Sequence, residues 1–187
     1  KVTKALTVDC ANPPAGGTEV VAYIANRDDI DSITYNVTNP TLIEAFVMKT
    51  DKLFYKYTGF KNAWDPQMDL NVGKYGNNYI HQIDGVLGID SPGDREELEN
   101  LFQSNVVMVI ENKKKGTLGK EAFECYGTTV GLEASSATRK QSDAETSGAF
   151  KFQLKTTPEQ FEPHMPNKVW KTSLTGTRAD MEALCTP

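Results

Sequence analysis

The chain has 187 residues, of which 39% are hydrophobic and 24% are charged, and these proportions are typical of a soluble globular protein. One large domain, residues 1–187, is the expected organisation at this length. The net charge of −5 argues against a surface that grips nucleic acid, and no apolar run approaches the roughly 18 residues of a membrane span. The first residues lack the apolar segment of a secretory signal, so we expect no membrane contact.

The first third of the chain predicts an arm and then strands. Residues 1–17 are turn-rich and without an apolar period, which indicates an extended N-terminal arm. The first strand is predicted at residues 18–25, and a short edge strand at residues 32–37. Residues 41–49 and 52–58 are rich in β-forming side chains on either side of Thr50-Asp51, and this pattern predicts a β-hairpin.

Residues 59–78 contain no clear helix or strand. Gly, Asn, Asp and Pro alternate there with large apolar side chains. A loop of this length is uncommon in a compact domain unless it is functional or disordered, and a disordered linker would be poor in aromatic residues. We therefore predict a projecting loop or hairpin that contacts another molecule.

Residues 79–111 predict a strand, a capped helix and a second strand, and this unit is the expected centre of the fold. The odd positions of the first strand carry Tyr, Ile, Leu and Ile and form a mostly apolar face. Ser91 is a good N-cap and Pro92 a good first helical residue, so a helix is predicted at about residues 92–104. Residues 106–110 are all apolar, which predicts a strand covered on both faces.

The remaining sequence predicts strands and an irregular end. Three further strands are expected at residues 120–126, 130–134 and 149–155, with a polar surface loop at residues 135–147. The proline-rich residues 157–187 predict an irregular tail with a short helix at residues 178–184. Together the elements predict a mainly β protein, a two-sheet β-sandwich or partly closed barrel with one flanking helix and a long projecting loop or hairpin.

The sequence offers little chemistry for catalysis. His81 lies on the apolar-facing side of its predicted strand, which favours a buried imidazole with its hydrogen bonds satisfied over a catalytic base. His164 lies between prolines and is predicted to be a loop residue. Cys10, Cys125 and Cys185 are odd in number and widely spaced, which predicts reduced thiols. We therefore predict no enzyme, no catalytic or metal-binding residues and no cofactor.

Four segments resemble virion structural proteins of bacteriophages that infect Bacteroides-type bacteria. They are Asp9-Cys10-Ala11-Asn12-Pro13 with Gly16-Gly17, Ile24-Ala25-Asn26-Arg27-Asp28-Asp29-Ile30, Ala122-Phe123-Glu124-Cys125-Tyr126-Gly127 with Val130-Gly131-Leu132-Glu133-Ala134, and Asp143-Ala144-Glu145-Thr146-Ser147-Gly148-Ala149-Phe150. The order of the predicted elements is also similar to that of the phage tail tube protein family. The resemblance covers most of residues 9–156.

The resemblance implies a two-sheet β-sandwich with one flanking helix and a long projecting hairpin. It also implies that subunits join their sheets into rings, and that hexameric rings stack into a hollow tube through which DNA passes without specific binding. Further tail or virion proteins would be the other partners. The expected location is the virion tail, after synthesis in the host bacterial cytoplasm. An acidic subunit suits such a lumen, because like charge repels DNA.

Two features of the sequence agree with an assembling subunit. Residues 106–110 and 42–48 are apolar on both faces, which is more apolar surface than one small sandwich needs to bury. Residues 59–78 supply large apolar side chains and reach. The predicted subunit interface comprises Phe60, Trp64, Met68, Leu70, Val72 and Tyr75 of the loop, with Leu42, Phe46, Met48, Val107 and Val109 of the strands.

Two other functions stay open from the sequence. The proline-rich end is more than a minimal tube subunit needs, and it is compatible with a tail terminator, a connector ring or a capsid-bound protein. A carbohydrate-binding or adhesin β-sandwich is the second alternative. In that case Trp64, Tyr75 and Tyr79 would form an exposed aromatic platform.

Overall fold

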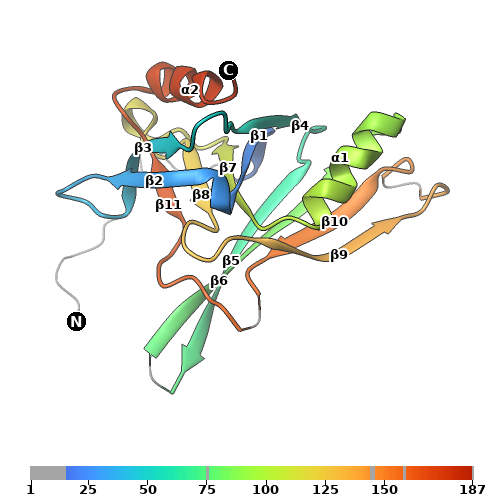
Figure 1. Cartoon of the computed structure of the whole chain (residues 1–187), viewed down its shortest axis with the longest axis horizontal. Helices are drawn as coiled ribbons and strands as arrows, with labels where there is room; N and C mark the ends of the chain where they lie inside the picture. Colours follow the sequence, from blue (N-terminus) through green and yellow to red (C-terminus); the bar gives the residue numbers. More distant parts are fainter. Residues whose placement is uncertain (1–15, 75, 144–145, 158, 187) are drawn as a thin grey trace.

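The computed structural model describes residues 16–74, 76–143, 146–157 and 159–186, and it shows two β-sheets and two short helices (Figure 1). The seven-stranded sheet has the order β2 (Ile30–Tyr35), β3 (Leu42–Met48), β11 (Asn167–Val169), β8 (Phe123–Tyr126), β7 (Val106–Asn112), β1 (Thr18–Asn26) and β4 (Tyr55–Thr58). The four-stranded sheet has the order β5 (Trp64–Gly73), β6 (Gly76–Leu87), β10 (Phe150–Lys155) and β9 (Glu133–Arg139). The helices are α1 (Pro92–Phe102) and α2 (Leu174–Ala183), and Arg27–Asp29 and Thr117–Gly119 form 3-10 turns.

The prediction of a mainly β, two-sheet protein is confirmed. Within the described residues neither sheet closes into a barrel, and a second helix, α2, accompanies the one flanking helix of the predicted fold, in the region where a short C-terminal helix was expected. The predicted arm at residues 1–17 lies almost wholly outside the described residues.

The helix α1 forms where the sequence predicts it. The Ser91 hydroxyl accepts a hydrogen bond from the backbone N–H of Asp94, and Pro92 opens the first turn, where its missing N–H costs no hydrogen bond. Leu98 and Leu101 are three residues apart and both are buried. They place α1 over the apolar space between the two sheets.

One core fills the space between the sheets. Its members are buried side chains that face inward from β1 and β7, from β5, β6 and β10, and from α1. The largest of its fully buried side chains are Trp64, Ile83, Met108, Ile110, Leu132 and Leu154. This inter-sheet core packs the four-stranded sheet against the rest of the molecule. It covers one face of that sheet only.

A second core covers the opposite face of the seven-stranded sheet. It contains Tyr23, Phe46, Phe54, Phe123 and Met181, and Met181 comes from α2. The alternate residues of β7 belong to the two different cores, so the strand is buried on both faces within one chain, as predicted. The further inference that its surplus apolar surface must meet another subunit is wrong, since α2 covers that surface.

The hairpin predicted from residues 41–58 does not form. The strand β3 pairs with β2 and β11, whereas β4 pairs with β1 near the other end of the sheet. The Phe46 and Phe54 rings meet edge to face with centroids 5.2 Å apart, so the connection passes over the α2-side core. Long-range burial of Phe54 outweighs the local turn signal at Thr50-Asp51.

The end of the chain is not an irregular tail. The strand β11 lies in the middle of the seven-stranded sheet, parallel to β3 and antiparallel to β8. The helix α2 begins earlier than predicted, with the Ser173 hydroxyl accepting a hydrogen bond from the Gly176 N–H. The polar residues expected to form a loop at 135–147 begin as a strand, because β9 continues to Arg139 along β10.

His81 is a buried core histidine, as predicted. Its Nδ1 accepts a hydrogen bond from the Gly127 backbone N–H at 3.2 Å, so Nδ1 carries no proton. Its Nε2 therefore donates to the carbonyl oxygen of His164 at 3.0 Å. Burial lowers the pKa of His81, although the carboxylates of Glu162 and Glu124 oppose that shift. The imidazole is neutral in the fold, and both of its nitrogens are used.

We expect acid to destabilise the protein through His81. The unfolded chain takes up a proton at the ordinary pKa of 6.5, while the folded chain holds the imidazole neutral to a lower pH. The free energy of unfolding should therefore fall as the pH drops below 6.5, with a slope of at most about 1.4 kcal/mol per pH unit from this group, and level off below the folded pKa. Urea unfolding between pH 5 and about pH 8 measures the slope. His81→Gln should flatten it and His164→Gln, at an exposed bend, should not; equal slopes in both variants would contradict this role.

Candidate functional site

The hairpin of β5 and β6 leaves the body of the molecule and is the candidate functional site (Figure 1). The two strands pair antiparallel from Trp64 opposite Gly85 to Gly73 opposite Gly76. Successive side chains alternate between two faces, so the even-numbered residues of β5 share a face with the odd-numbered residues of β6. This inner face continues directly from the inter-sheet core.

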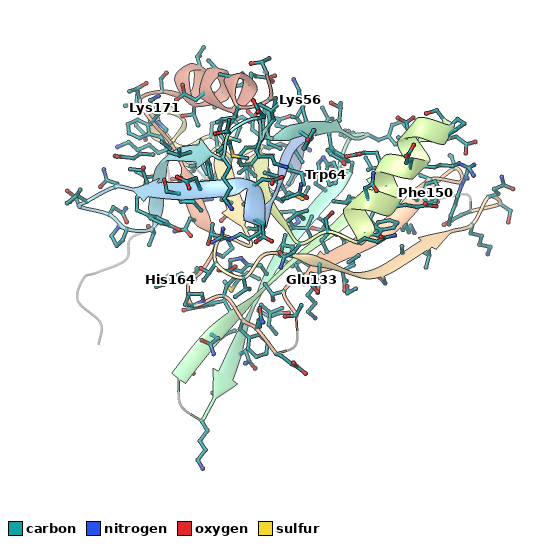
Figure 2. All side chains as sticks on the ribbon, viewed as in Figure 1. Lys56, Trp64, Glu133, Phe150, His164 and Lys171 are labelled. Carbon is teal, nitrogen blue, oxygen red and sulfur yellow. The ribbon has the colours of Figure 1, made fainter. Side chains whose placement is uncertain are left out.

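The base of the hairpin is anchored in that core. The Trp64 side chain is 2% exposed, and its ring lies 6.2 Å from that of Phe152 in an edge-to-face contact. Its indole Nε1 donates a hydrogen bond to the Val20 carbonyl oxygen at 3.1 Å. Gly85 lies opposite, where a Cβ would be 2.4 Å from the Phe152 ring. Figure 2 shows Trp64 where the hairpin enters the body.

Exposure of the inner face rises toward the tip of the hairpin. Pro66 and Met68 are half-buried, Leu70 is 52% exposed and Val72 is 75% exposed. Leu70 lies opposite Tyr79, whose backbone exchanges two hydrogen bonds with that of Glu162. The apolar face of β5 that starts in the core thus continues into solvent. Exposed apolar surface of this kind often marks a site where another molecule binds.

The outer face of the four-stranded sheet is polar and hydrogen-bonded across its strands. The Asp84 carboxylate on β6 accepts from Gln153 Nε2 on β10 at 2.8 Å and from Gln67 Nε2 on β5 at 3.1 Å. The Ser135 hydroxyl on β9 donates to Gln153 Oε1 at 2.8 Å. This amide and carboxylate network joins all four strands and gives the sheet one wet face and one dry face.

The four-stranded sheet also has long edge strands. The strand β5 has 10 residues and β9 has 7, and each pairs with a neighbour on one side only among the described residues. The edges of the seven-stranded sheet are shorter, with 6 residues in β2 and 4 in β4. Because a long open edge is a template for pairing with another chain, β5 and β9 are the stronger candidates for contacts between subunits.

The structure divides the predicted interface residues into three groups. Four of them are buried inside the chain and cannot reach a second subunit: Phe46, Trp64, Val107 and Val109. Leu42, Met48 and Met68 are half-buried, and Tyr75 lies outside the described residues. Leu70, Val72 and Phe60 are exposed, but Phe60 lies at the base of the hairpin against Gly88. The hairpin tip therefore retains Leu70 and Val72 as the exposed apolar residues of the prediction.

The sequence analysis did not single out Glu162, which is fully buried. Its carboxylate accepts hydrogen bonds from the backbone N–H groups of Thr129 and Val130, both at 2.9 Å, and from the Thr128 hydroxyl at 3.4 Å. Gly131, with φ +82, shapes this loop, and its Cα lies against the Asn105 amide. The available signal in the sequence was the glycine pair at residues 127 and 131, since both glycines adopt a positive φ in this loop.

The lysines at residues 113–115 are paired within the chain. Lys115 Nζ lies 2.7 Å from Glu111 and 3.0 Å from Glu19, and Lys114 Nζ lies 2.7 Å from Glu121.

Burial raises the pKa of the Cys125 thiol, which is free and fully enclosed. In the described part of the chain no group of three or more His, Cys, Asp or Glu is arranged to hold a metal ion.

Comparison with protein-family models, with curated proteins and with solved structures found no match to this chain. Neither described helix has the length and apolar character that crossing a membrane requires. The class of protein that the structure itself defines is a mainly β, two-sheet fold.

Proposed function

We propose that the chain is a non-enzymatic structural subunit that assembles with copies of itself into rings, and that these rings stack as a phage tail tube. The observation that carries the proposal is the β5–β6 hairpin, whose apolar face passes from 2% exposed at Trp64 to 75% exposed at Val72. The strand pair has an apolar face that is covered by the core only at its base. The exposed apolar surface at its tip is what we expect of a surface that binds a partner.

The strand directions permit a ring. Each strand of the four-stranded sheet is antiparallel to the next, so β5 and β9 run in opposite directions. If copies repeat head to tail, β9 of one copy therefore meets β5 of the next as an antiparallel pair. A repeated heterologous contact of this kind forms a ring when the rotation between copies closes. The hairpin tip would extend past the ring that β9 and β5 form and would contact a neighbouring ring.

The polar outer face of the four-stranded sheet suits a lumen for DNA. Asp65 and Asp84 are cross-strand partners on this face, an arrangement that is unfavourable in an isolated sheet because like charges lie opposite. Gln67 lies beside them and donates a hydrogen bond to Asp84. The carboxylates of this face would repel phosphates, in keeping with the net charge of −5, although Lys151 and Lys155 of β10 lie on the same face.

A terminator or connector ring would use the same edge strands, β5 and β9. The number of stacked rings therefore distinguishes these roles from a tube.

The carbohydrate-binding alternative is weaker, since its platform required an exposed Trp64 and that side chain is in the core. Negative-stain electron microscopy of the purified chain tests the proposal. Stacked rings would support it, and a monomer at every protein concentration would overturn it.

Shortening the hairpin should abolish stacking without unfolding the subunit. Replacing residues 71–78 by Asn-Gly joins Leu70 to Tyr79 through a two-residue turn and removes exposed Val72 while leaving Trp64 and the Tyr79–Glu162 bridge in place. We expect the Tm to change by less than about 3 °C, because surface changes are usually within about 0.5 kcal/mol. Micrographs should show single rings or monomers in place of tubes.

A matched pair of point variants separates the two faces of the tip. Val72→Ser removes apolar surface from the inner face, whereas Asn71→Ser changes the outer face of the same strand. Stacking should be weakened by the first and unaffected by the second. Normal tubes from the shortened hairpin would overturn the assigned role of the tip.

A further inference from the structure

A pocket of about 250 Å³ lies between the helix α2 and the strands β3 and β11, and we call it the α2 pocket. Its floor is apolar and is formed by the buried side chains of Phe46, Val169 and Met181. These residues belong to the core on the α2 side of the seven-stranded sheet. An apolar cavity of about 150 Å³ holds a benzene molecule, so the α2 pocket has room for a branched aliphatic side chain.

The rim of the α2 pocket is acidic. Glu44 of β3 and Asp180 of α2 are half-buried there, and Lys171 is exposed. The Lys171 ammonium lies 2.9 Å from the Asp180 carboxylate, whereas Glu44 accepts a hydrogen bond from the neutral amide of Asn36 at 2.6 Å. One carboxylate thus stands without a cation among these rim residues. The pocket therefore fits an apolar side chain that is accompanied by a positive charge.

The α2 pocket and the tip of the β5–β6 hairpin lie at opposite ends of the molecule (Figure 1). Figure 2 shows Lys171, which lines the pocket, beside α2 at the end away from the tip. The tip therefore does not reach the pocket of its own chain, but it can reach the pocket of a copy placed beyond it. A contact between two different patches, repeated from copy to copy, gives an open stack.

The hairpin tip carries a side chain that matches the pocket. Val72 is 75% exposed. The next strand pair toward the turn is Gly73 opposite Gly76, which has no side chains to cover Val72. Lys74 follows in the turn and is exposed. The tip thus combines a branched apolar side chain with a cation two residues away.

We propose that the hairpin tip of a subunit in one ring inserts Val72 into the α2 pocket of a subunit in the next ring, with Lys74 beside Glu44. This inference rests on the proposed stacking of rings and names the site that receives the hairpin. Insertion removes apolar surface of both partners from water. Each ring then presents tips on one side and pockets on the other, so the rings stack in one direction only.

Filling the α2 pocket tests the proposal. Ala183 is exposed on α2 and lines the pocket, so Ala183→Trp places an indole at the pocket and leaves its buried floor unchanged. The protein concentration at which tubes sediment should rise by about tenfold or more, which is the worth of burying a valine side chain. Ala179→Trp is the matched control, because Ala179 is exposed on the same helix but does not line the pocket. It should leave stacking unchanged.

A double variant shows whether the tip and the pocket share one contact. Val72→Ser combined with Ala183→Trp should stack no worse than the weaker of the two single variants, because both changes remove the same contact. Normal tubes from Ala183→Trp would mean that the pocket has another occupant or none, and would overturn the proposal. Fully additive losses in the double variant would also overturn it.

Disulfide trapping then locates the contact. A chain with Val72→Cys and Ala183→Cys, in which Cys10 and Cys185 are replaced by serine, should give a ladder of cross-linked chains when assembled tubes are oxidised. The same chain with Ala179→Cys in place of Ala183→Cys should give little. Tubes that stack without a ladder would overturn the α2 pocket as the receiving site while the proposed stacking stands. If the unsubstituted chain forms no tubes, both proposals are overturned.

Discussion

Replacing Glu162 by alanine should lower the free energy of unfolding by about 3 kcal/mol. The carboxylate is fully buried and accepts hydrogen bonds from the N–H groups of Thr129 and Val130 and from the Thr128 hydroxyl. Alanine would leave these donors without their acceptor, and an unsatisfied buried donor such as the Thr128 hydroxyl costs about 1–3 kcal/mol. Urea unfolding at pH 7.5 measures the loss.

Two variants of the same segment serve as controls for Glu162. Glu162→Gln keeps one carbonyl oxygen that can accept from both N–H groups, so its loss should be smaller, about 1 kcal/mol. Glu159→Ala, at an exposed position three residues earlier, should change stability by less than about 0.5 kcal/mol. Equal losses for alanine at 159 and 162 would contradict the role of the buried carboxylate.

Elements whose own residues carry their burial pattern could be predicted from the sequence. In β6 the buried positions are the odd-numbered ones from His81 to Leu87, as the alternation indicates. In β10, Phe152 and Leu154 point inward and Lys151 and Gln153 outward. In both strands, the alternation of apolar and polar residues identifies the face that packs against the core.

Pairing between distant strands could not be predicted. The local signal at Thr50-Asp51 is a turn, and Asp51 does adopt a positive φ of 59°. A turn does not determine which strands it joins, and β4 pairs with β1 because Tyr55 and Tyr57 then face the inter-sheet core side. The central place of β11 is likewise invisible in its three residues, since it depends on the gap between β3 and β8.

The candidate site shows the same limit on a smaller scale. The sequence predicted a projecting hairpin with large apolar residues, and the structure has one. It could not show where along β5 the core ends, because Trp64, Met68 and Val72 have the same parity on the strand. The cover depends on Ile24, Met108 and other residues distant in sequence. Half of an amphipathic strand can thus belong to the core and the other half to a surface.

Replacing Trp64 by alanine should be among the most destabilising single changes, with a loss of about 3–5 kcal/mol. The side chain is 2% exposed, packs against Phe152 and donates its indole N–H to the Val20 carbonyl. Alanine would open a large cavity in the inter-sheet core and remove the indole hydrogen bond, while the Val20 carbonyl would keep its bond from the Gly59 backbone N–H. Val72→Ala, on the same face of the same strand but 75% exposed, should change stability by less than about 0.5 kcal/mol.

The comparison of Trp64 with Val72 separates the core role from the surface role of β5. Trp64→Phe keeps an aromatic ring in the core and should lose less than Trp64→Ala, in chemical unfolding at equal protein concentration. If Trp64 instead belonged to an exposed binding platform, Trp64→Ala would leave the unfolding curve unchanged. In the same preparations Val72→Ala should weaken assembly although the subunit remains stable, because the base of β5 fixes the fold and its tip makes the contact proposed between rings.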